Sequence, residues 1–538
     1  MLRKRLTTAA ALCSLLLLAA ACGGTAKPSA PADVDWPSFG GTPAGTRSSA
    51  LDGVDVHNVD RLGVAWSRQL GQHESLSETY PVVVGGTMYV TTNESQVIAL
   101  DATTGAQKWQ YTPRVDLLAE GALGSSPISR GVTVAAGRVY LATFDDRLIA
   151  LDAQTGTALW DRVVANPRTG ATQNSPPSYW KGLLIIGSAG DDIGVRGFVA
   201  AYDAATGAQR WRFNTVPAPG RGWMPPGPNG GGGHVWMPPT VDPATATVYA
   251  GTGNRSPGIS ASPRAGCDRW ADATIALDAR TGRLRWGHSE QCGDVWDYDS
   301  GQPPVVFRPG AANGAGAGVP TVGHANKGGT YWLLRADNGH VIAKSPPLVP
   351  QSSPRPLPTA KGERVCPGAL GGIAYSPAAI GQESIYQTAA VQCMTYRTNA
   401  GAGGRTPGRF VEIGGGIAQP IPGMPTTGEI VALDQRTAKV RWRRAMPAPM
   451  VGGALATAGG LVFSGSDDGY LYAFADADGS TVWRGHVGLA FGSAPLTYRV
   501  DGVQYIAVAA GGSSLAQLSG SHVGARLVVL RLGGRPLR

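Results

Sequence analysis

Four polar segments of this sequence contain residue types that could carry chemistry. They are DVWDYD at 294–299, SAGDDIGVRG at 188–197, GTGN at 251–254 and HANKGG at 324–329. In the first, Asp297 and Asp299 stand two residues apart, so an extended backbone would present both carboxylates on one face. Such a pair could bind a hard cation through oxygen, or one member could accept a proton from a substrate. The structural alternative is that the two residues only cap a turn.

A repeated unit must position these segments, because it recurs along most of the chain. It consists of an apolar strand, then Asp-x-x-Thr-Gly, then a Trp four residues later. The Asp is expected to cap the turn, the Gly to supply a positive φ, and the Trp to pack between adjacent sheets. The unit is found at 97–109, 148–160, 199–211, 274–286, 430–442 and 471–483, and in a degraded form at 331–343.

The spacing of the repeats predicts the architecture. Further short strands follow Gly turns between the units, which gives about four strands per repeat of roughly 40 to 75 residues. That pattern is typical of a β-propeller. The opening segment 36–49 and the closing segment 525–532 could together complete an eighth blade. We therefore expect an all-β fold, with residues 35–538 forming a single eight-bladed β-propeller of four-stranded antiparallel blades.

The composition agrees with a turn-rich globular protein. The 538 residues include 77 Gly and 40 Pro, and hydrophobic residues make up 43% of the chain. The formal net charge is +9, but the Lys and Arg residues are scattered after the first five positions. Because nucleic-acid binding requires clustered positive charge, no nucleic-acid partner is expected.

The first 22 residues have the pattern of a lipoprotein signal peptide. Arg3, Lys4 and Arg5 precede a short apolar run at 12–21, which ends at AAACGG and resembles a lipoprotein box with Cys22 as the lipidated residue. Residues 23–34 would then form a flexible tether. The prediction is an exported, lipid-anchored protein on the extracytoplasmic side of the cell membrane. The alternative is ordinary secretion with cleavage near Ala21.

Four cysteines follow this segment: Cys267, Cys292, Cys366 and Cys393. An even number in an exported chain favours disulfides. The expected pairs are Cys267–Cys292 and Cys366–Cys393, although the spacing leaves other pairings open. The sequence contains no CxxCH motif, which excludes a covalently attached c-type haem.

The repeat together with the four polar segments resembles the pyrroloquinoline quinone (PQQ) dehydrogenases, the quinoprotein alcohol dehydrogenase family. The resemblance runs from Trp36 to about Gly512. It implies that Asp297 is the catalytic base and that Lys327 contacts the quinone oxygen and assists catalysis. It also implies that Asp192, Asn254, Asp297 and Asp299 ligate the metal.

The resemblance extends to the cofactor pocket. The run GGGHVW at 231–236 is similar to the segment that ends in the cofactor-stacking Trp, here Trp236. Glu78, Arg130 and the residues Ser188, Ala189 and Gly190 stand at cofactor-contacting positions. The chain departs from the family pattern in three places: Asp192 replaces Glu, Met450 replaces Trp, and residues 124–126 lack the adjacent cysteine pair.

The resemblance implies PQQ as cofactor, with calcium or a lanthanide as metal. In the family, an Asp at the position of Asp299 marks lanthanide-using members. The expected activity is oxidation of an alcohol or sugar-like substrate. Because no haem motif is present, the electron acceptor would be a separate cytochrome c or membrane quinone. The alternative is a non-catalytic propeller lipoprotein that serves as an envelope binding or assembly scaffold.

Overall fold

The computed structural model describes residues 32–71, 76–115, 128–167, 171–190, 195–217, 231–310, 316–398 and 415–537. Within these ranges the regular secondary structure is almost entirely β, with one 3-10 helix, η1 (Val59–Arg61), and one short α-helix, α2 (Ser514–Leu518). The all-β prediction is therefore confirmed. Cys22, Asp192 and residues 124–126 lie outside the described residues.

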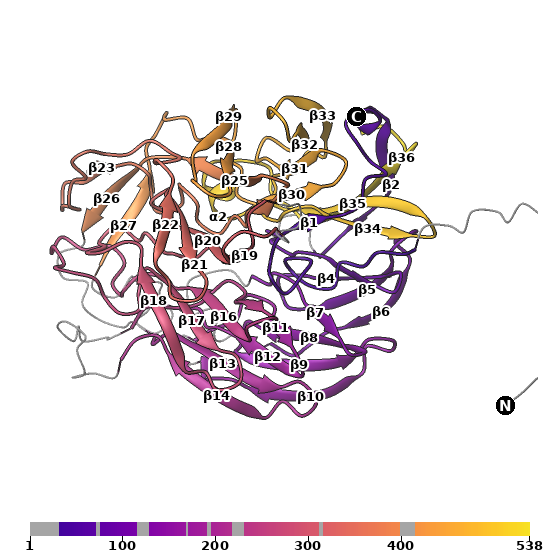
Figure 1. Ribbon diagram of the computed structural model, residues 1–538, viewed down its shortest axis with the longest axis horizontal. Coiled ribbons are helices and arrows are strands. Elements are labelled where there is room, and N and C mark those ends of the chain that lie inside the picture. The colour runs from indigo at the N-terminus through magenta and orange to yellow at the C-terminus, as the bar shows by residue number, and fades with distance from the viewer. Residues whose placement is uncertain are drawn as a thin grey trace, which may run out of the picture.

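Seven sheets among the described residues contain four antiparallel strands each, and an eighth contains four antiparallel strands with one short parallel strand added at its inner edge. Figure 1 shows the eight sheets arranged in chain order around a common centre. This arrangement agrees with the predicted propeller. Within each sheet the strands are given from the innermost to the outermost. The first sheet contains β3 (Val82–Val84), β4 (Thr87–Thr91), β5 (Val97–Asp101) and β6 (Gln107–Tyr111), and the second contains β7 (Thr133–Ala135), β8 (Arg138–Thr143), β9 (Arg147–Asp152) and β10 (Ala158–Val163). The third contains β11 (Ser178–Trp180), β12 (Leu183–Ile186), β13 (Phe198–Asp203) and β14 (Gln209–Asn214), and the fourth contains β15 (Thr240–Asp242), β16 (Thr247–Gly251), β17 (Ala273–Asp278) and β18 (Leu284–Ser289).

The other four sheets continue the series. They are β19 (Val305–Phe307), β20 (Thr321–Ala325), β21 (Tyr331–Arg335) and β22 (Val341–Lys344); β24 (Ala379–Ile380), β25 (Ser384–Val391), β28 (Thr427–Asp434) and β29 (Val440–Met446); β30 (Ala454–Thr457), β31 (Leu461–Gly465), β32 (Tyr470–Ala475) and β33 (Thr481–His486); and β34 (Leu496–Val500), β35 (Val503–Ala510), β36 (Arg526–Leu532) and β2 (Leu62–Gln69). A small additional sheet contains β23 (Glu363–Val365), β26 (Met394–Thr398) and β27 (Gly416–Pro420).

The ring closes differently from the expectation. β36 belongs to the last sheet, as predicted, but its outer partner is β2 and not the opening segment 36–49. Residues 34–49 instead run along the innermost strands. Trp36 pairs with Val83 of β3, and β1 (Ser48–Ser49) lies parallel to β30. Between them, backbone amides of β7, β15, β19 and β24 donate to the carbonyls of Pro37, Pro43, Ala44 and Thr46.

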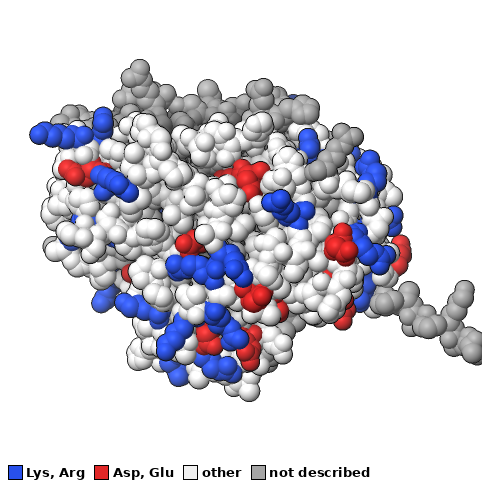
Figure 2. Space-filling view, turned by 90° about the horizontal axis from the view of Figure 1, so that it is seen from above, with Lys and Arg blue, Asp and Glu red and all other residues white. Residues whose placement is uncertain are grey.

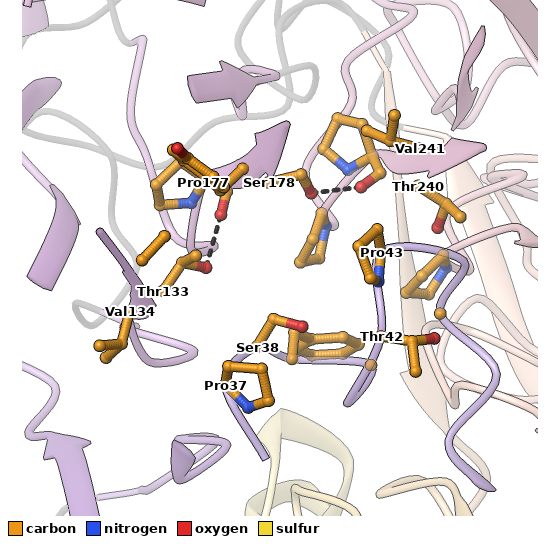
Figure 3. A pocket seen from close by; sticks show the side chains of 18 of the residues that line it. Pro37, Ser38, Thr42, Pro43, Thr133, Val134, Pro177, Ser178, Thr240 and Val241 are labelled. Atoms are coloured by element: carbon orange, nitrogen blue, oxygen red, sulfur yellow. Dashed lines mark hydrogen bonds between the residues drawn. The ribbon is translucent and has the colours of Figure 1, made fainter. Parts of the chain in front are cut away.

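A cavity of about 110 Å³ lies between this opening segment and the first strands of the second to fourth sheets (Figure 3). Three of the hydroxyls that line it have partners in the same arrangement. Thr133, Ser178 and Thr240 each donate to the carbonyl of a proline that immediately precedes the first strand of the next sheet. None of the residues lining the cavity belongs to the four polar segments, so this cavity is not the candidate site.

Five of the six repeat tryptophans connect neighbouring sheets, as the sequence predicted. Trp211 donates from Nε1 to the Ala279 carbonyl of the next sheet at 2.9 Å. Its ring lies against Gly282, where a Cβ would stand 2.5 Å from Trp211 Cε3, and Gly282 has φ +70°. The requirement for Gly in the motif therefore has two causes, a left-handed backbone and the contact with the ring. The same pair of contacts recurs for the repeat tryptophans Trp109, Trp160, Trp286 and Trp442, and also for Trp66 of β2, which lies outside the repeat units.

Charge is distributed without a patch of one sign on the face that Figure 2 shows, where Lys and Arg alternate with Asp and Glu. Ion pairs join charges near the outer strands, including Arg210–Asp203 and Arg285–Asp278, both at 2.6 Å.

Candidate active site

The topology brings the predicted site residues to one end of the sheets. In an antiparallel sheet, the second and fourth strands end where the first strand begins. Asn254 and Lys327 follow the second strands β16 and β20. Glu78, Arg130, Trp236 and the segment 294–299 lie in the connections that lead from one sheet to the first strand of the next. All of these positions therefore share an end of the propeller.

Lys327 forms the centre of a charged trio with the two predicted carboxylates. Its Nζ lies 2.8 Å from Asp297 Oδ1 and 2.8 Å from Asp299 Oδ2. The side chains of Lys327, Asp297 and Asp299 are 8%, 16% and 7% exposed. Burial acts to lower the pKa of Lys327, but the two carboxylates outweigh it and hold that pKa well above its usual value. The lysine is therefore protonated, and the trio has a formal charge of −1.

Backbone contacts fix the trio. The Lys327 amide donates to the Asp299 carbonyl at 3.0 Å, and the Asn254 amide donates to Asp299 Oδ1 at 2.6 Å. Asp297 has φ +63°, a left-handed backbone that is uncommon for residues other than Gly, although Asn and Asp adopt it more often than most. Such conformations persist where the surrounding structure enforces them, and they cluster at functional sites.

Asn254 has the properties of a metal ligand. It is fully buried, its Nδ2 donates to the Arg255 carbonyl, and its Oδ1 is buried without a hydrogen-bond partner. A Cβ built on Gly258 would lie 2.6 Å from Asn254 Nδ2 and 3.4 Å from Asp297 Cβ, so the two side chains approach the same small space. Since a buried acceptor without a donor costs about 1–3 kcal/mol, Asn254 Oδ1 suits an oxygen-seeking cation.

The described residues supply only part of a ligand set. Carboxylates of Asp297 and Asp299 and the amide oxygen of Asn254 are of the type that calcium and lanthanides prefer. No group of three His, Cys, Asp or Glu side chains that could hold a metal occurs in the described ranges, from which Asp192 is absent.

A second cluster joins Glu78, Arg130 and Trp236. Arg130 Nη2 lies 2.6 Å from Glu78 Oε2, and both side chains are almost completely buried. The Arg130 guanidinium carbon lies 5.3 Å from the Trp236 ring centroid and 5.1 Å from that of Tyr375. Arg130 Nε and Nη1 are buried without hydrogen-bond partners. A planar anionic cofactor fits this cluster, because an aromatic face and unsatisfied guanidinium donors lie side by side.

Burial raises the pKa of Glu78, while Arg130 and Tyr375 act in the opposite direction. Tyr375 is a member of the cluster that the sequence did not reveal. Its ring lies 6.2 Å from that of Trp236, edge to face, and its hydroxyl donates to the Gly492 carbonyl. No motif distinguishes this residue among the 16 tyrosines of the chain.

The segment 188–190 is connected to Asn254 through His234. Ser188 Oγ lies 3.1 Å from His234 Nδ1, and His234 Nε2 lies 2.6 Å from the Val195 carbonyl. The His234 carbonyl in turn accepts from the amide of Gly253. Burial lowers the pKa of His234 to about 4, so its ring is neutral at physiological pH. Ala189 forms a β-bridge with Thr172, and Gly190, with φ +110°, is the last described residue before Asp192.

The two clusters adjoin at Gly301. A Cβ at this position would lie 2.3 Å from Trp236 Cζ2, so the segment that contains Asp299 runs directly against the Trp236 ring. The structure thus brings together the predicted residues Glu78, Arg130, Ser188, Trp236, Asn254, Asp297, Asp299 and Lys327.

Comparison with known proteins agrees with this geometry. Residues 36–354 and 424–506 match the family model described as PQQ, glucose/ethanol/alcohol dehydrogenase, beta-propeller domain. The chain belongs to this family. The quinohemoprotein alcohol dehydrogenase of Comamonas testosteroni is 34% identical over 520 residues, which cover 89% of this chain and 72% of that protein. Quinohemoprotein alcohol dehydrogenase ADH IIB of Pseudomonas putida is 31% identical, with coverage of 91% and 75%.

Solved structures show the same fold. The crystal structure of the Comamonas testosteroni quinohemoprotein alcohol dehydrogenase superposes with a TM-score of 0.82 at 31% identity, covering 93% of this chain and 81% of that one. A europium-containing methanol dehydrogenase gives a TM-score of 0.82 at 27% identity, with coverage of 93% and 98%. The prediction of a PQQ-dependent alcohol dehydrogenase, an oxidoreductase, is confirmed at the level of the family.

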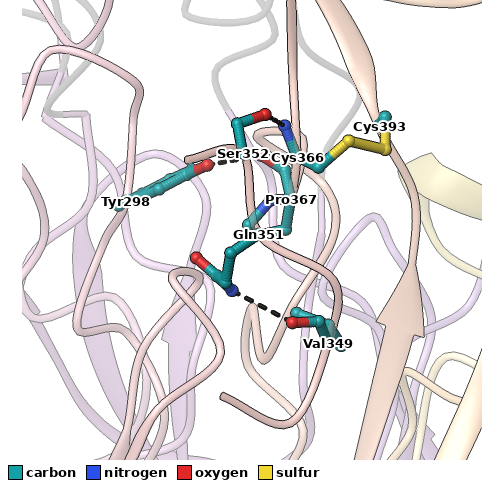
Figure 4. Close-up of a disulfide and its surroundings, with 7 residues drawn as sticks. All are labelled: Tyr298, Val349, Gln351, Ser352, Cys366, Pro367 and Cys393. Atoms are coloured by element: carbon teal, nitrogen blue, oxygen red, sulfur yellow. Dashed lines mark hydrogen bonds between the residues drawn. A yellow bond between two sulfur atoms is a disulfide. The ribbon is translucent and has the colours of Figure 1, made fainter. Parts of the chain in front are cut away.

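Both predicted disulfides of this dehydrogenase are present, Cys267–Cys292 and Cys366–Cys393. The second lies beside the carboxylate segment, as Figure 4 shows. Tyr298, between Asp297 and Asp299, donates its hydroxyl to the Pro367 carbonyl, and the Cys366 amide donates to Ser352 Oγ at 2.9 Å. The disulfide therefore joins Cys393, the residue before β26, to a loop that holds the carboxylate segment.

Met450, where the family pattern has Trp, is fully buried and packs in an apolar cluster. No helix of the described chain has the length and apolar character needed to cross a membrane.

Proposed function

We propose that this dehydrogenase oxidises an alcohol or sugar-like substrate with PQQ and a bound calcium or lanthanide ion. The observation that carries the proposal is the convergence of two preformed clusters at Gly301. One contains two carboxylates, a lysine and the unsatisfied Asn254 Oδ1, and the other contains an aromatic face with unsatisfied guanidinium donors.

Six residues would hold the two groups. Trp236 would stack on the cofactor, and Arg130 would donate from Nε and Nη1 to its acidic groups. Asn254, Asp297 and Asp299 would ligate the metal through oxygen, together with Asp192. When bound, PQQ supplies the acceptor for the hydride of the substrate, and the metal polarises it.

Asp297 is assigned the role of base. Its carboxylate is only 16% exposed, so a substrate hydroxyl placed beside it is shielded from bulk water. Asp297 would accept the hydroxyl proton as the carbon is oxidised. Lys327 would provide a fixed positive charge in the same region, which stabilises negative charge that develops during the reaction.

Reconstitution tests the activity. The purified chain is incubated with PQQ and either calcium or lanthanum, and dye reduction is measured with a panel of alcohols and sugars. Substrate-dependent dye reduction by the wild type that is lost in Asp297→Asn supports the proposal. Failure to bind PQQ with either metal would contradict it and would favour the scaffold alternative.

We propose further that the protein is exported and anchored through a lipid on Cys22, which is supported by the signal-like segment 1–22 and the tether 23–34. Cys22→Ser should release it from the membrane fraction, and retention of the variant in that fraction would contradict the anchor.

Electrons would leave to a separate cytochrome c or to membrane quinone, because this sequence contains no CxxCH motif.

A further inference from the structure

A buried glutamate that belongs to none of the predicted site residues lies behind the charged trio. Glu290 follows β18 directly, and its side chain is completely inaccessible to solvent. Its Oε1 accepts from Thr274 Oγ1 and faces His324 Nδ1, both at 2.5 Å. Its Oε2 accepts from Ser300 Oγ at 3.0 Å and from Asn326 Nδ2 at 3.4 Å. Four side chains from three other segments thus converge on one carboxyl group.

His324 contacts three groups of this network. Its Nε2 lies 2.7 Å from the Gln302 carbonyl, which can only accept, so this nitrogen carries a proton. The other nitrogen, Nδ1, lies 2.5 Å from Glu290 Oε1 and 2.8 Å from Thr274 Oγ1. Burial acts to raise the pKa of Glu290, but His324, Thr274 and Ser300 together bring it below its usual value.

The donors on Oε2 are the sequence neighbours of two site residues. Ser300 follows Asp299, and Asn326 precedes Lys327. Glu290 thereby bridges the two segments that also meet in the hydrogen bond from the Lys327 amide to the Asp299 carbonyl. The packing leaves little slack, because a Cβ on Gly251 would lie 2.2 Å from the Ser300 carbonyl oxygen and 2.4 Å from His324 Nε2.

We propose that Glu290 is a positioning residue, which with His324 holds the Asp299 segment and the Lys327 turn at the separation that the charged trio requires. The roles of Asp299 and Lys327 in metal and cofactor binding rest on the proposed function. The contacts through which Glu290 joins the two segments do not depend on it.

Two substitutions separate hydrogen bonding from simple loss of volume and charge. In Glu290→Gln, the amide oxygen can replace Oε2 and accept from Ser300 and Asn326. The amide nitrogen cannot accept from Thr274, but it can donate to Thr274 Oγ1, and that hydroxyl can donate to His324 Nδ1, 2.8 Å away. Glu290→Ala leaves Ser300 and Asn326 without this acceptor and leaves Thr274 and His324 to pair only with each other. Ser300→Ala removes only the hydrogen bond from Ser300 to Glu290. The matched control is Ser464→Ala, because Ser464 is a fully buried serine of β31 that donates to the Gly453 carbonyl at 2.9 Å.

The first readout requires neither metal nor cofactor. Hydrogen exchange of the Ser300 and Lys327 amides, which donate to Thr252 and Asp299, is measured at single-residue resolution. Exchange should accelerate at least about fivefold in Glu290→Ala, because buried partners are left unpaired. Glu290→Gln should remain close to the wild type. Unchanged exchange in Glu290→Ala, or equal acceleration in Glu290→Gln, would overturn the proposal.

The second readout is metal affinity, with terbium as the probe and luminescence excited through tryptophan. Supporting contacts behind metal ligands are worth about 10–100-fold in affinity. Glu290→Ala should lose that amount, and Glu290→Gln should keep most of the wild-type affinity. If Glu290→Ala does not fold, the proposal is tested with Ser300→Ala instead. Weaker binding and faster exchange than in Ser464→Ala support the proposal, and identical behaviour of the two refutes it. A wild-type chain that binds no terbium would contradict the proposed metal site, and hydrogen exchange would still decide the role of Glu290.

Discussion

Replacing Lys327 with methionine should destabilise the metal-free protein and strengthen metal binding. Lys327 Nζ contacts both Asp297 and Asp299 at 2.8 Å, and none of the three side chains is more than 16% exposed. Removing one partner of a buried ion pair costs about 3–5 kcal/mol. With an unfolding entropy of about 2 cal/mol/K per residue, a chain of 538 residues loses about 1 °C in Tm per kcal/mol. The metal-free variant should therefore melt about 3–5 °C lower.

The effect of metal should have the opposite sign. The substitution changes the formal charge of the trio from −1 to −2, so a cation should bind at least about tenfold more tightly, which is about 1.4 kcal/mol. Scanning calorimetry with and without calcium or lanthanum measures both effects. Lys108→Met serves as the control, because Lys108 lies 3.8 Å from Asp101 and is 39% exposed, and such surface pairs contribute little. If metal raises the Tm of Lys327→Met no more than that of the wild type, the charge argument is wrong.

Four further substitutions address the base, the cofactor platform, the contact between a repeat glycine and a tryptophan, and a buried acid. Asp297→Asn keeps an oxygen ligand but cannot accept the proton, so turnover should fall ~10²–10⁴-fold in the dye assay while PQQ still binds; undiminished turnover would refute the assignment. Trp236→Ala should weaken PQQ binding by about 1–3 kcal/mol in a fluorescence titration, by analogy with base stacking on aromatic rings. Gly282→Ala should lower the free energy of unfolding by about 2–4 kcal/mol in a denaturant titration, whereas Gly266→Ala, with φ +74° and open space around it, should show only the backbone strain of about 1–2 kcal/mol. Burial raises the pKa of Asp467 from 3.8 to about 8, so the folded protein retains a proton that the unfolded chain releases. Stability should therefore fall as pH rises from about 4 to 8, and melting curves of Asp467→Asn should show a smaller decline over that range.

The repeat predicted most of the fold because each unit contains the residues that its own turn and its contact with the next sheet require. The turn needs an Asp to cap it and a Gly with positive φ, and the Trp needs a surface on the next sheet. Those requirements act within one unit and its neighbour, so a single sequence displays them. Closure of the ring depends on which of several similar segments, distant in sequence, pairs with β36. For that reason the prediction that segment 36–49 completes the last blade was wrong, and β2 occupies the place.

The polar segments of the site were predictable to the extent that they resemble known motifs. Asn254, Asp297, Asp299 and Lys327 converge, but Asp192 lies outside the described residues and its role stays a prediction. Tyr375 and Glu290 gave no signal, because each lies in an irregular connection between sheets where neither periodicity nor a motif exists. Their importance comes from partners that are distant in sequence, and only the folded structure shows those partners.

In each half of the site, one charged side chain neutralises the group that would bind the ligand. Lys327 neutralises one of two carboxylates where a cation would bind, and Glu78 neutralises Arg130 where an anionic cofactor would bind. These contacts stabilise the empty fold and reduce the affinity of each subsite taken alone. Binding of the cation and the anionic cofactor together reduces both repulsions, because the two ligands have opposite charges and each compensates the other. Since the clusters touch at Gly301, the arrangement favours joint binding of metal and cofactor over binding of either one.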